Sequence, residues 1–201
     1  KMNNQFKICI IGAGIVGLAI AERLSKFYKD IIVIEKENTF GQHVSSRNSE
    51  VIHSGFYYPK DSLKSTLCIK GNRMLYEFAK KYHINYKKCG KLVVINDKKD
   101  EKELIKIKNH ALGCGLTKLE ILNKEESRKI EHRVNCYKSL FIPTAGIIDS
   151  HSVMAKLEYL AKSRDVDFLY KSKITSIRKQ SDYYEICIND SKYFLKSDIV
   201  I

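Results

Sequence analysis

The chain has 201 residues, of which 44% are hydrophobic and 29% charged, proportions typical of a folded globular protein. An excess of 36 Lys and Arg over 23 Asp and Glu gives a net charge of +13, which favours anionic partners. The basic residues are scattered and form no nucleic-acid-binding motif, so we expect no nucleic acid partner, and no apolar run is long enough to span a membrane.

The first elements follow a strand–helix–strand pattern. Residues 6–11 are an apolar run, as in a buried parallel strand. Apolar positions recur at helical spacing over 15–27, and 31–34 is a second buried strand. The polar, turn-rich stretch 38–48 is expected to be a loop or an irregular helix start.

The turn after the first strand carries a G-x-G-x-x-G motif at Gly12, Gly14 and Gly17. We expect Gly12 to make the tight turn, Gly14 to let a pyrophosphate approach the backbone, and Gly17 to let the helix pack closely on the strands. The N–H groups of the first helical residues, Ile15 and Val16, would then face the phosphates. With a strand before and a helix after, the motif predicts a dinucleotide site.

The second strand ends at Glu35, where a carboxylate can accept hydrogen bonds from ribose hydroxyls. A 2′-phosphate would be repelled there, which disfavours NADP. The motif itself does not decide between NAD and FAD.

The middle of the chain mixes helices and strands. A long helix is expected over 62–82, a strand over 92–95, a charged helix over 97–112, and strands over 119–122 and 140–142. The apolar stripe of the long helix is expected to lie in the core. Its members are Leu63, Leu67, Leu75, Phe78 and Ala79.

Capping signals mark two further helices. Asn123 is a plausible N-cap for a short helix with Glu125 and Glu126 in its first turn. After a loop over 143–149, Ser150 is expected to cap a helix over residues 152–162.

The end of the chain changes to closely spaced strands, expected over 166–170, 174–178, 184–188, 193–195 and 198–201. The simplest topology is a parallel strand, a three-stranded meander and a return strand. Because the chain stops inside an apolar run, we expect an N-terminal fragment.

Three blocks of sequence carry a resemblance: Ser45–Pro59, extended by Ser62–Lys64 and Leu67–Cys68; Lys88–Val94; and Pro143–Asp149. Together they closely resemble the L-2-hydroxyglutarate dehydrogenase/oxidase family, which belongs with glycine oxidase and glycerol-3-phosphate dehydrogenase to the FAD-dependent oxidoreductases. The resemblance implies FAD as the cofactor. One departure is Glu50, where the family often has glycine; a carboxylate near the flavin would repel an anionic substrate unless it points away.

The resemblance also implies a fold. We expect an α/β protein with a Rossmann-like FAD-binding domain of the glutathione-reductase type, with a β-meander, formed by residues 1–80 and 144–201. An α+β substrate domain, residues 81–143, would be inserted between these pieces.

By resemblance, Ser46, Arg47 and Ser49 lie along the flavin pyrophosphate and ring edge. Ile174 touches the adenine through its backbone, and Lys36 flanks the adenosine.

The same resemblance places His53 near the flavin ring. Histidine suits proton transfer near neutral pH, so His53 is the candidate general base. Two alternatives are a neutral histidine that hydrogen-bonds the flavin or backbone, and covalent attachment of the flavin.

Tyr57, Tyr58 and Lys91 are candidates for binding a dicarboxylate, with Lys64 and Arg73 as further candidates. Each can instead be a solvated or structural residue. No spacing of His or Cys suggests a metal site, and the six cysteines form no CxxC pair, so we expect reduced thiols.

The predicted function is oxidation of a small anionic 2-hydroxy acid, L-2-hydroxyglutarate to 2-oxoglutarate, by hydride transfer to flavin. The alternatives are another FAD-dependent amine or amino-acid oxidase, a glycerol-3-phosphate-type dehydrogenase, and a non-catalytic flavin-binding module. Oxygen or a membrane quinone would accept the electrons. The expected location is cytoplasmic or peripheral on the inner face of a membrane, although compositional bias also explains the basic charge.

Overall fold

The computed structural model describes residues 4–191 and 194–201, which form two compact units. The first is built from the described residues of Lys1–Asn48 and Ser150–Ile201, and the second from Ser49–Asp149. These boundaries group 49–80 and 144–149 with the segment that we expected to be the insert. A compact unit is not by itself a functional domain, so the division into FAD-binding and substrate domains stays a prediction.

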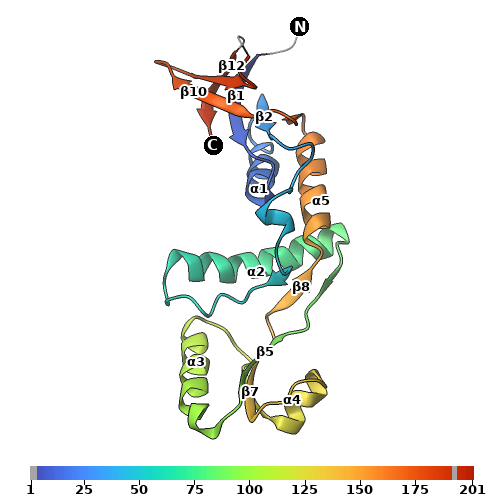
Figure 1. Cartoon of the computed structure of the whole chain (residues 1–201), viewed down its shortest axis with the longest axis vertical. Coiled ribbons are helices and arrows are strands. Elements are labelled where there is room, and N and C mark those ends of the chain that lie inside the picture. Colours follow the sequence, from blue (N-terminus) through green and yellow to red (C-terminus); the bar gives the residue numbers. More distant parts are fainter. Residues whose placement is uncertain (1–3, 192–193) are drawn as a thin grey trace. The chain divides into compact units, whose positions relative to one another are not determined.

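The first unit contains one six-stranded sheet, drawn at the blue and red ends of the colour scale in Figure 1. Its strand order is β10–β11–β12–β1–β2–β9, with parallel pairing from β12 to β9 and antiparallel pairing in the β10–β11–β12 meander. The strands are β1 (Gln5–Ile11), β2 (Ile31–Ile34), β9 (Asp167–Leu169), β10 (Ile174–Lys179), β11 (Tyr184–Ile188) and β12 (Phe194–Val200). The expected Rossmann-like sheet with a meander is therefore confirmed.

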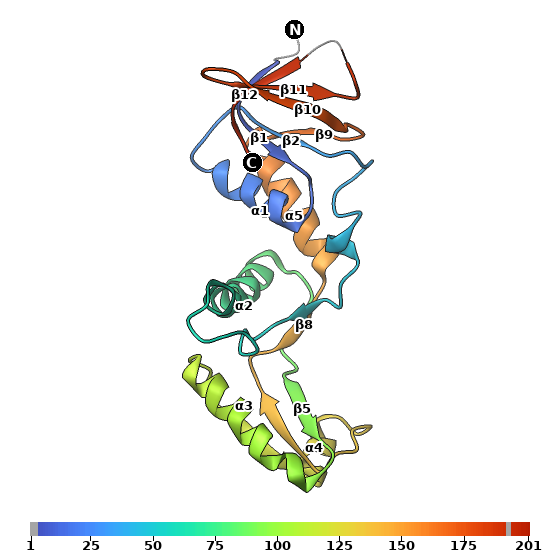
Figure 2. The same ribbon diagram turned by 60° about the vertical axis from the view of Figure 1, so that its left-hand side comes forward.

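Two helices of this unit, α1 (Ile15–Leu24) and α5 (Ser150–Lys162), pack against each other beside the parallel strands (Figure 2). The apolar side chains that they bury include Leu18 and Met154. A separate cluster of Phe6, Cys9, Ile32 and Ile34 packs with Ile186 of the meander. The parallel strands are thus held both by helices and by the meander.

The last strand corrects the expected topology. A separate meander strand over 193–195 and return strand over 198–201 were predicted, but β12 is one continuous strand. It pairs antiparallel with β11 from Phe194 to Ser197 and parallel with β1 from Lys196 to Val200. Tyr193 lies outside the described residues. One strand therefore closes the meander and returns the chain to the parallel sheet.

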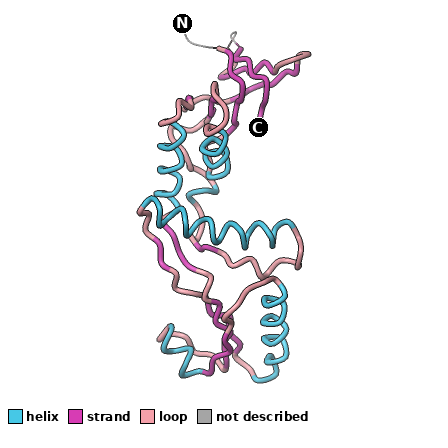
Figure 3. Tube along the Cα trace, turned by 180° about the vertical axis from the view of Figure 1, so that it is seen from behind, coloured by secondary structure: helices cyan, strands magenta, loops and turns pink. Residues whose placement is uncertain are grey.

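The second unit holds two three-stranded sheets, β3–β8–β4 and β5–β7–β6. Their strands are β3 (Val51–Ile52), β4 (Tyr86–Lys87), β5 (Lys91–Ile95), β6 (Glu120–Asn123), β7 (Lys138–Ile142) and β8 (Gly146–Ile148). The helices are α2 (Leu63–Tyr82), α3 (Glu101–Gly113) and α4 (Lys124–Ile130). Short 3-10 turns span Val44–Ser46 in the first unit and Lys98–Asp100 here. Figure 3 shows this mixture of helices and strands, which fits the expected α+β composition.

The core of this unit lies where α3 packs on β5 and β7. Leu104 of α3 and Leu140 and Ile142 of β7 are almost completely buried, together with Phe56. The expected cap of α4 is confirmed, because Asn123 and Glu126 form a reciprocal capping box. Two local expectations were wrong: β8 occupies part of the predicted loop 143–149, and α5 begins at Ser150, which is therefore not its N-cap.

The stripe of α2 that we expected in the core is largely exposed. Leu63 and Leu67 are 73% and 54% exposed, whereas Ser65 and Asn72 are buried. Of the predicted stripe only Ala79 is fully buried. The reason is that the inward face of α2 packs against backbone carbonyl groups, which need hydrogen-bond donors.

No helix in the described part of the chain is long and apolar enough to cross a membrane.

Candidate functional site

Each glycine of the motif has a measurable task. Gly12 has φ +98°, a left-handed conformation that a side chain would strain. A Cβ on Gly17 would lie 2.0 Å from the carbonyl oxygen of Gly12, so only glycine lets α1 approach the end of β1. A Cβ on Gly14 would come within 3.2 Å of Ser45 Oγ. At Gly12, Gly14 and Gly17 the turn therefore depends on residues without a side chain.

The N-terminus of α1 is open to a ligand. Gly14 is the N-cap residue, in an extended conformation, and its position offers no side chain to cap the helix. Ser45 Oγ accepts a hydrogen bond from the N–H of Ile15 at 3.0 Å. The remaining first-turn N–H groups, including that of Val16, and the positive end of the helix dipole favour an anion. A phosphate is the ligand that such a turn suits.

Glu35 is 9% exposed and fastens this turn from the end of β2. Its Oε2 accepts from the N–H of Ala13 at 2.7 Å, and its Oε1 accepts from the N–H of Glu37 at 2.9 Å. A carboxylate has about four acceptor sites, so two remain for other donors. The expected contact with ribose hydroxyls stays a prediction, but the carboxylate has a structural task beside it.

The segment after β2 carries the other residues that were predicted to bind the cofactor, and its Ser45 contacts the turn. Lys36 is exposed and lies 3.8 Å from Glu37. Ser46 and Arg47 are exposed, with Ser46 Oγ donating to the carbonyl of His43. The side chain that contacts α1 is that of Ser45, which sequence reasoning did not single out within its Ser-Ser-Arg block. Ser49 is exposed and belongs to the second unit.

Ile174 is the first residue of β10, where it pairs with Ile188. Its side chain packs on the cluster around Ile186. Its predicted backbone contact with adenine is not tested by this packing and stays a prediction.

Tyr170 was not singled out in the sequence. Its hydroxyl donates a hydrogen bond to Glu158 at 2.6 Å. Burial, this hydrogen bond and the nearby carboxylates of Glu158 and Glu35 raise the pKa of Tyr170.

His53 lies in the second unit, directly after β3, and its side chain is exposed. Its backbone carbonyl accepts a hydrogen bond from Asn72 Nδ2 of α2 at 3.0 Å. Asn72 was not noticed in the sequence, because a buried asparagine among apolar residues carries no motif. The backbone of His53 is thus anchored while its ring faces outward.

The candidate substrate residues form two pairs in the same unit. Lys91 Nζ lies 4.8 Å from the ring centroid of Tyr57, and Lys64 Nζ lies 4.3 Å from that of Tyr58. Partial burial raises the pKa of Tyr57. Each lysine thus lies over an aromatic face, in the geometry of a cation–π interaction. Arg73 is exposed on α2 and belongs to neither pair.

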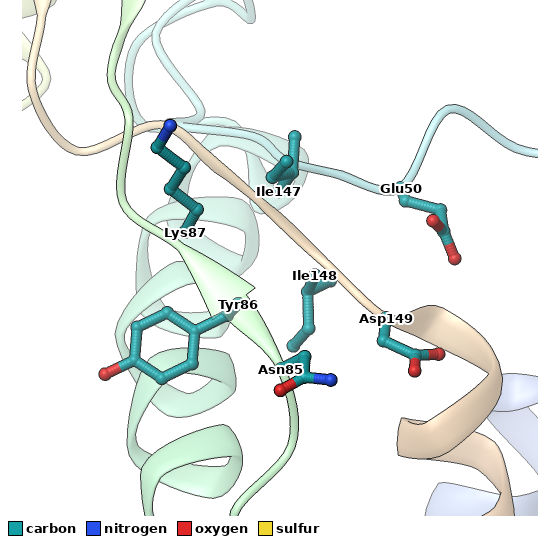
Figure 4. Close-up of a pocket in the computed structure, with 7 residues that line it drawn as sticks. All are labelled: Glu50, Asn85, Tyr86, Lys87, Ile147, Ile148 and Asp149. Carbon is teal, nitrogen blue, oxygen red and sulfur yellow. The ribbon is translucent and has the colours of Figure 1, made fainter.

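A cavity of about 310 Å³ in the second unit is lined by residues of β4 and β8 and by residues next to β3, β4 and β8 (Figure 4). Figure 4 shows the carboxylates of Glu50 and Asp149 at one end and the ammonium of Lys87 at the other. Tyr86, Asn85, Ile147 and Ile148 complete the lining. Two carboxylates make that end unsuited to a dicarboxylate, so the cavity differs in chemistry from the lysine–tyrosine pairs.

Glu50 has φ +56°, a left-handed conformation that favours glycine at this position. A left-handed conformation costs an L-residue about 1 kcal/mol. We expect Glu50→Gly to keep the fold and to raise the free energy of unfolding by up to about 1 kcal/mol, as measured by urea denaturation. Unfolding at lower urea would mean that the contacts of the Glu50 side chain outweigh its backbone strain.

The described residues include no group of three or more His, Cys, Asp or Glu side chains placed to hold a metal ion. All six cysteines have free thiols. Cys9 lies in β1, and burial raises the pKa of its thiol to about 12, so this thiol stays protonated.

Comparison with known proteins places the fold and the turn in context. A family model described as FAD dependent oxidoreductase matches residues 7–192. The chain is 35% identical over 173 residues to a mitochondrial L-2-hydroxyglutarate dehydrogenase of Arabidopsis thaliana, covering 86% of this chain and 35% of that protein. It is 32% identical over 194 residues to a glycerol 3-phosphate dehydrogenase of Caloramator mitchellensis, covering 96% and 40%.

A solved structure, FAD-bound L-alpha-glycerophosphate oxidase from Mycoplasma pneumoniae, matches with a TM-score of 0.89 and 24% identity over 98% of this chain and 53% of that one. At this identity the likeness shows the fold alone. The chain spans 35% of the length of the Arabidopsis relative. The predicted family resemblance and the FAD cofactor are confirmed, whereas the substrate and the site residues are not tested.

Proposed function

This chain belongs to the FAD dependent oxidoreductase family, and from that premise we propose that it forms the FAD-binding part of an enzyme that oxidises L-2-hydroxyglutarate to 2-oxoglutarate. The observation that carries the proposal is the side-chain-free turn of Gly12, Gly14 and Gly17 at the N-terminus of α1. The 35% identity to an L-2-hydroxyglutarate dehydrogenase supports the choice of substrate.

The residues at this turn fit the pyrophosphate of FAD. The first-turn N–H groups of α1 would hold it, because they offer donors and the positive end of the helix dipole. Gly14 leaves room for the phosphates, and a side chain there would meet Ser45. Glu35 would accept from the ribose hydroxyls with the acceptor sites that Ala13 and Glu37 leave free.

When bound, FAD supplies the hydride acceptor that protein side chains lack. The chain's own task is to hold the substrate and to move the hydroxyl proton. We assign the proton to the imidazole of His53, which is exposed, because histidine is the most common general base in enzymes. The ammonium groups of Lys91 and Lys64, held over Tyr57 and Tyr58, would attract the substrate carboxylates.

The proposal is tested with the purified full-length protein. Flavin released on denaturation must be FAD, and anaerobic addition of L-2-hydroxyglutarate must bleach the bound flavin. D-2-hydroxyglutarate is the matched control, because it has the same charges and the opposite configuration. Protein that releases no flavin, or flavin that neither enantiomer bleaches, would contradict the proposal.

Glycerol 3-phosphate is the second candidate substrate, favoured by 32% identity to a glycerol 3-phosphate dehydrogenase over 96% of the chain. It shares a secondary alcohol and an anionic group with L-2-hydroxyglutarate. Faster bleaching by glycerol 3-phosphate than by L-2-hydroxyglutarate would move the proposal to this substrate. Bleaching by glycine or proline alone would indicate an amine oxidase.

We also propose that electrons leave through a quinone at the inner face of a membrane, with the protein bound peripherally. The net charge of +13 supports this, since basic surfaces are attracted to anionic lipid. The protein should co-sediment with vesicles of anionic phospholipid at low salt and be released at high salt. Absence of binding at low salt would favour oxygen as the acceptor and a cytoplasmic enzyme.

A further inference from the structure

The buried face of α2 carries hydrogen-bond donors at nearly helical spacing. Ser65 Oγ donates to the carbonyl of Gly55 at 3.1 Å. Asn72 Nδ2 donates to the carbonyls of His53 and Thr144 at 3.0 and 2.9 Å, and Tyr76 donates to Thr144 at 3.2 Å. One face of one helix thus holds two loops that are far apart in the sequence.

Asn72 is the member that joins the two loops. Its side-chain amide has two N–H donors, and each is used on a different carbonyl group. The residue is 8% exposed, so water cannot readily replace these bonds. Without Asn72 the carbonyl of His53 would keep only the weak thiol donor of Cys68, whereas the carbonyl of Thr144 would keep the hydroxyl of Tyr76.

The neighbouring strands β3 and β8 pair with each other, and Ser65 holds the carbonyl of Gly55, but the other side-chain groups close to the His53 carbonyl bind it weakly or not at all. The hydroxyls of Ser54 and Thr144, on the same loops, are buried without a hydrogen-bond partner. Cys68 reaches the carbonyl of His53 only through a weak thiol donor at 3.8 Å. Asn72 is therefore the stronger of the two side-chain donors to the His53 carbonyl, and it acts beside the β3–β8 pairing that precedes this residue.

Fixing a carbonyl also fixes a side chain. The peptide unit is planar, so holding the carbonyl of His53 sets the plane that follows its Cα and limits the direction of its Cα–Cβ bond. His53 is exposed, so the backbone carbonyl is the part of this residue that Asn72 holds.

We propose that Asn72 is a positioning residue, which orients the imidazole of His53 through the His53 carbonyl and ties that loop to Thr144. The inference rests on the proposed function, in which His53 takes the substrate proton. Asn72 does not take part in the chemistry; it acts through His53.

The first measurement is amide hydrogen exchange in the protein without substrate. Residues 53–55 should exchange more slowly than the exposed residues 42–44 in the wild type. Asn72→Ala should speed exchange at 53–55 by about tenfold or more, the consequence of losing about 1.4 kcal/mol or more of local stability. Lys70→Ala, an exposed change on the same helix, should leave it unchanged, and Tyr76→Phe should affect only the Thr144 loop.

The second measurement is a double-mutant cycle on kcat of the FAD-loaded full-length enzyme. Asn72→Ala alone should lower kcat by about tenfold or more, because small misplacements of a reacting group are costly. In a His53→Ala background the same change should cost less than about twofold. If Asn72→Ala lowers kcat by the same factor in the His53→Ala background as in the wild type, the proposal is overturned.

The proposal and the proposed function fail in different ways. An active wild-type enzyme with additive losses contradicts only the role of Asn72. A wild type that oxidises no hydroxy acid contradicts the proposed function, and with it the proposed role of Asn72 in that reaction. If Asn72→Ala does not fold, wild-type exchange at 53–55 as fast as at 42–44 still overturns the positioning role.

Discussion

Gly17→Ala is expected to destabilise the first unit by about 3 kcal/mol, at the upper end of the usual cost of overpacking. A Cβ at this position would lie 2.0 Å from the Gly12 carbonyl oxygen, and the clashing atom belongs to the backbone. It cannot rotate away as the end of a flexible side chain would. The turn must open instead, which moves the first N–H groups of α1 and should abolish FAD binding.

Gly71→Ala is the matched control for this change. Gly71 lies inside α2, and a Cβ there would meet no atom within 4 Å. Alanine should therefore raise stability by about 0.5–1 kcal/mol, as expected for glycine replaced inside a helix. Urea denaturation and FAD titration of both variants make the comparison. A Gly17→Ala protein that is as stable as the wild type and binds FAD would contradict the close packing of α1 on the turn.

The β1–α1–β2 unit could be predicted because several local signals agree there. Apolar strands, glycine spacing and a terminal acid each have a physical reason to occur together in such a unit. Strand β2 begins at Ile31 and ends at Ile34 as expected, while α1 ends at Leu24, three residues before the predicted end. Helix ends depend on tertiary packing and are less well encoded locally.

The long helix α2 was located correctly, but its buried face was not. Apolar periodicity chose the stripe that contains Leu63 and Leu67, which is exposed. The buried face instead presents Ser65 and Asn72 to backbone carbonyls of two loops. A prediction from apolar periodicity assumes that the helix packs on an apolar surface. No local sequence pattern indicates that α2 packs on backbone carbonyl groups instead.

Short strands and long-range contacts were not predicted, because they too depend on partners that are distant in the sequence. β3 and β4 have two residues each, too few to display alternation, and exist because β8 pairs with both. At the candidate site, the residue types of the Ser45–Arg47 block were informative. Which serine bonds the N–H of Ile15 depends on how residues 38–48 fold back, and the sequence does not encode that locally.

Glu35→Ala should lower the stability of the first unit by about 3 kcal/mol, because two backbone N–H groups lose a charged acceptor. Both bonds are short, at 2.7 Å to Ala13 and 2.9 Å to Glu37, and Glu35 is buried. Glu35→Gln keeps one acceptor oxygen and should show about half of this loss. Glu37→Gln is the control: Glu37 is more exposed than Glu35, and its ion pairs are at the surface, so a change within about 0.5 kcal/mol is expected.

The state in which stability is measured separates the two tasks of Glu35. A carboxylate that served only to bind ribose would leave the FAD-free protein unaffected by Glu35→Ala, and the loss would appear only in the affinity for FAD. A carboxylate that fastens the glycine turn must lower the urea midpoint of the FAD-free protein as well. Because Ala13 and Glu37 bind this carboxylate through their backbone N–H groups, we expect the FAD-free protein to lose stability first. Weaker FAD binding then follows, since part of the binding energy is spent on closing the turn.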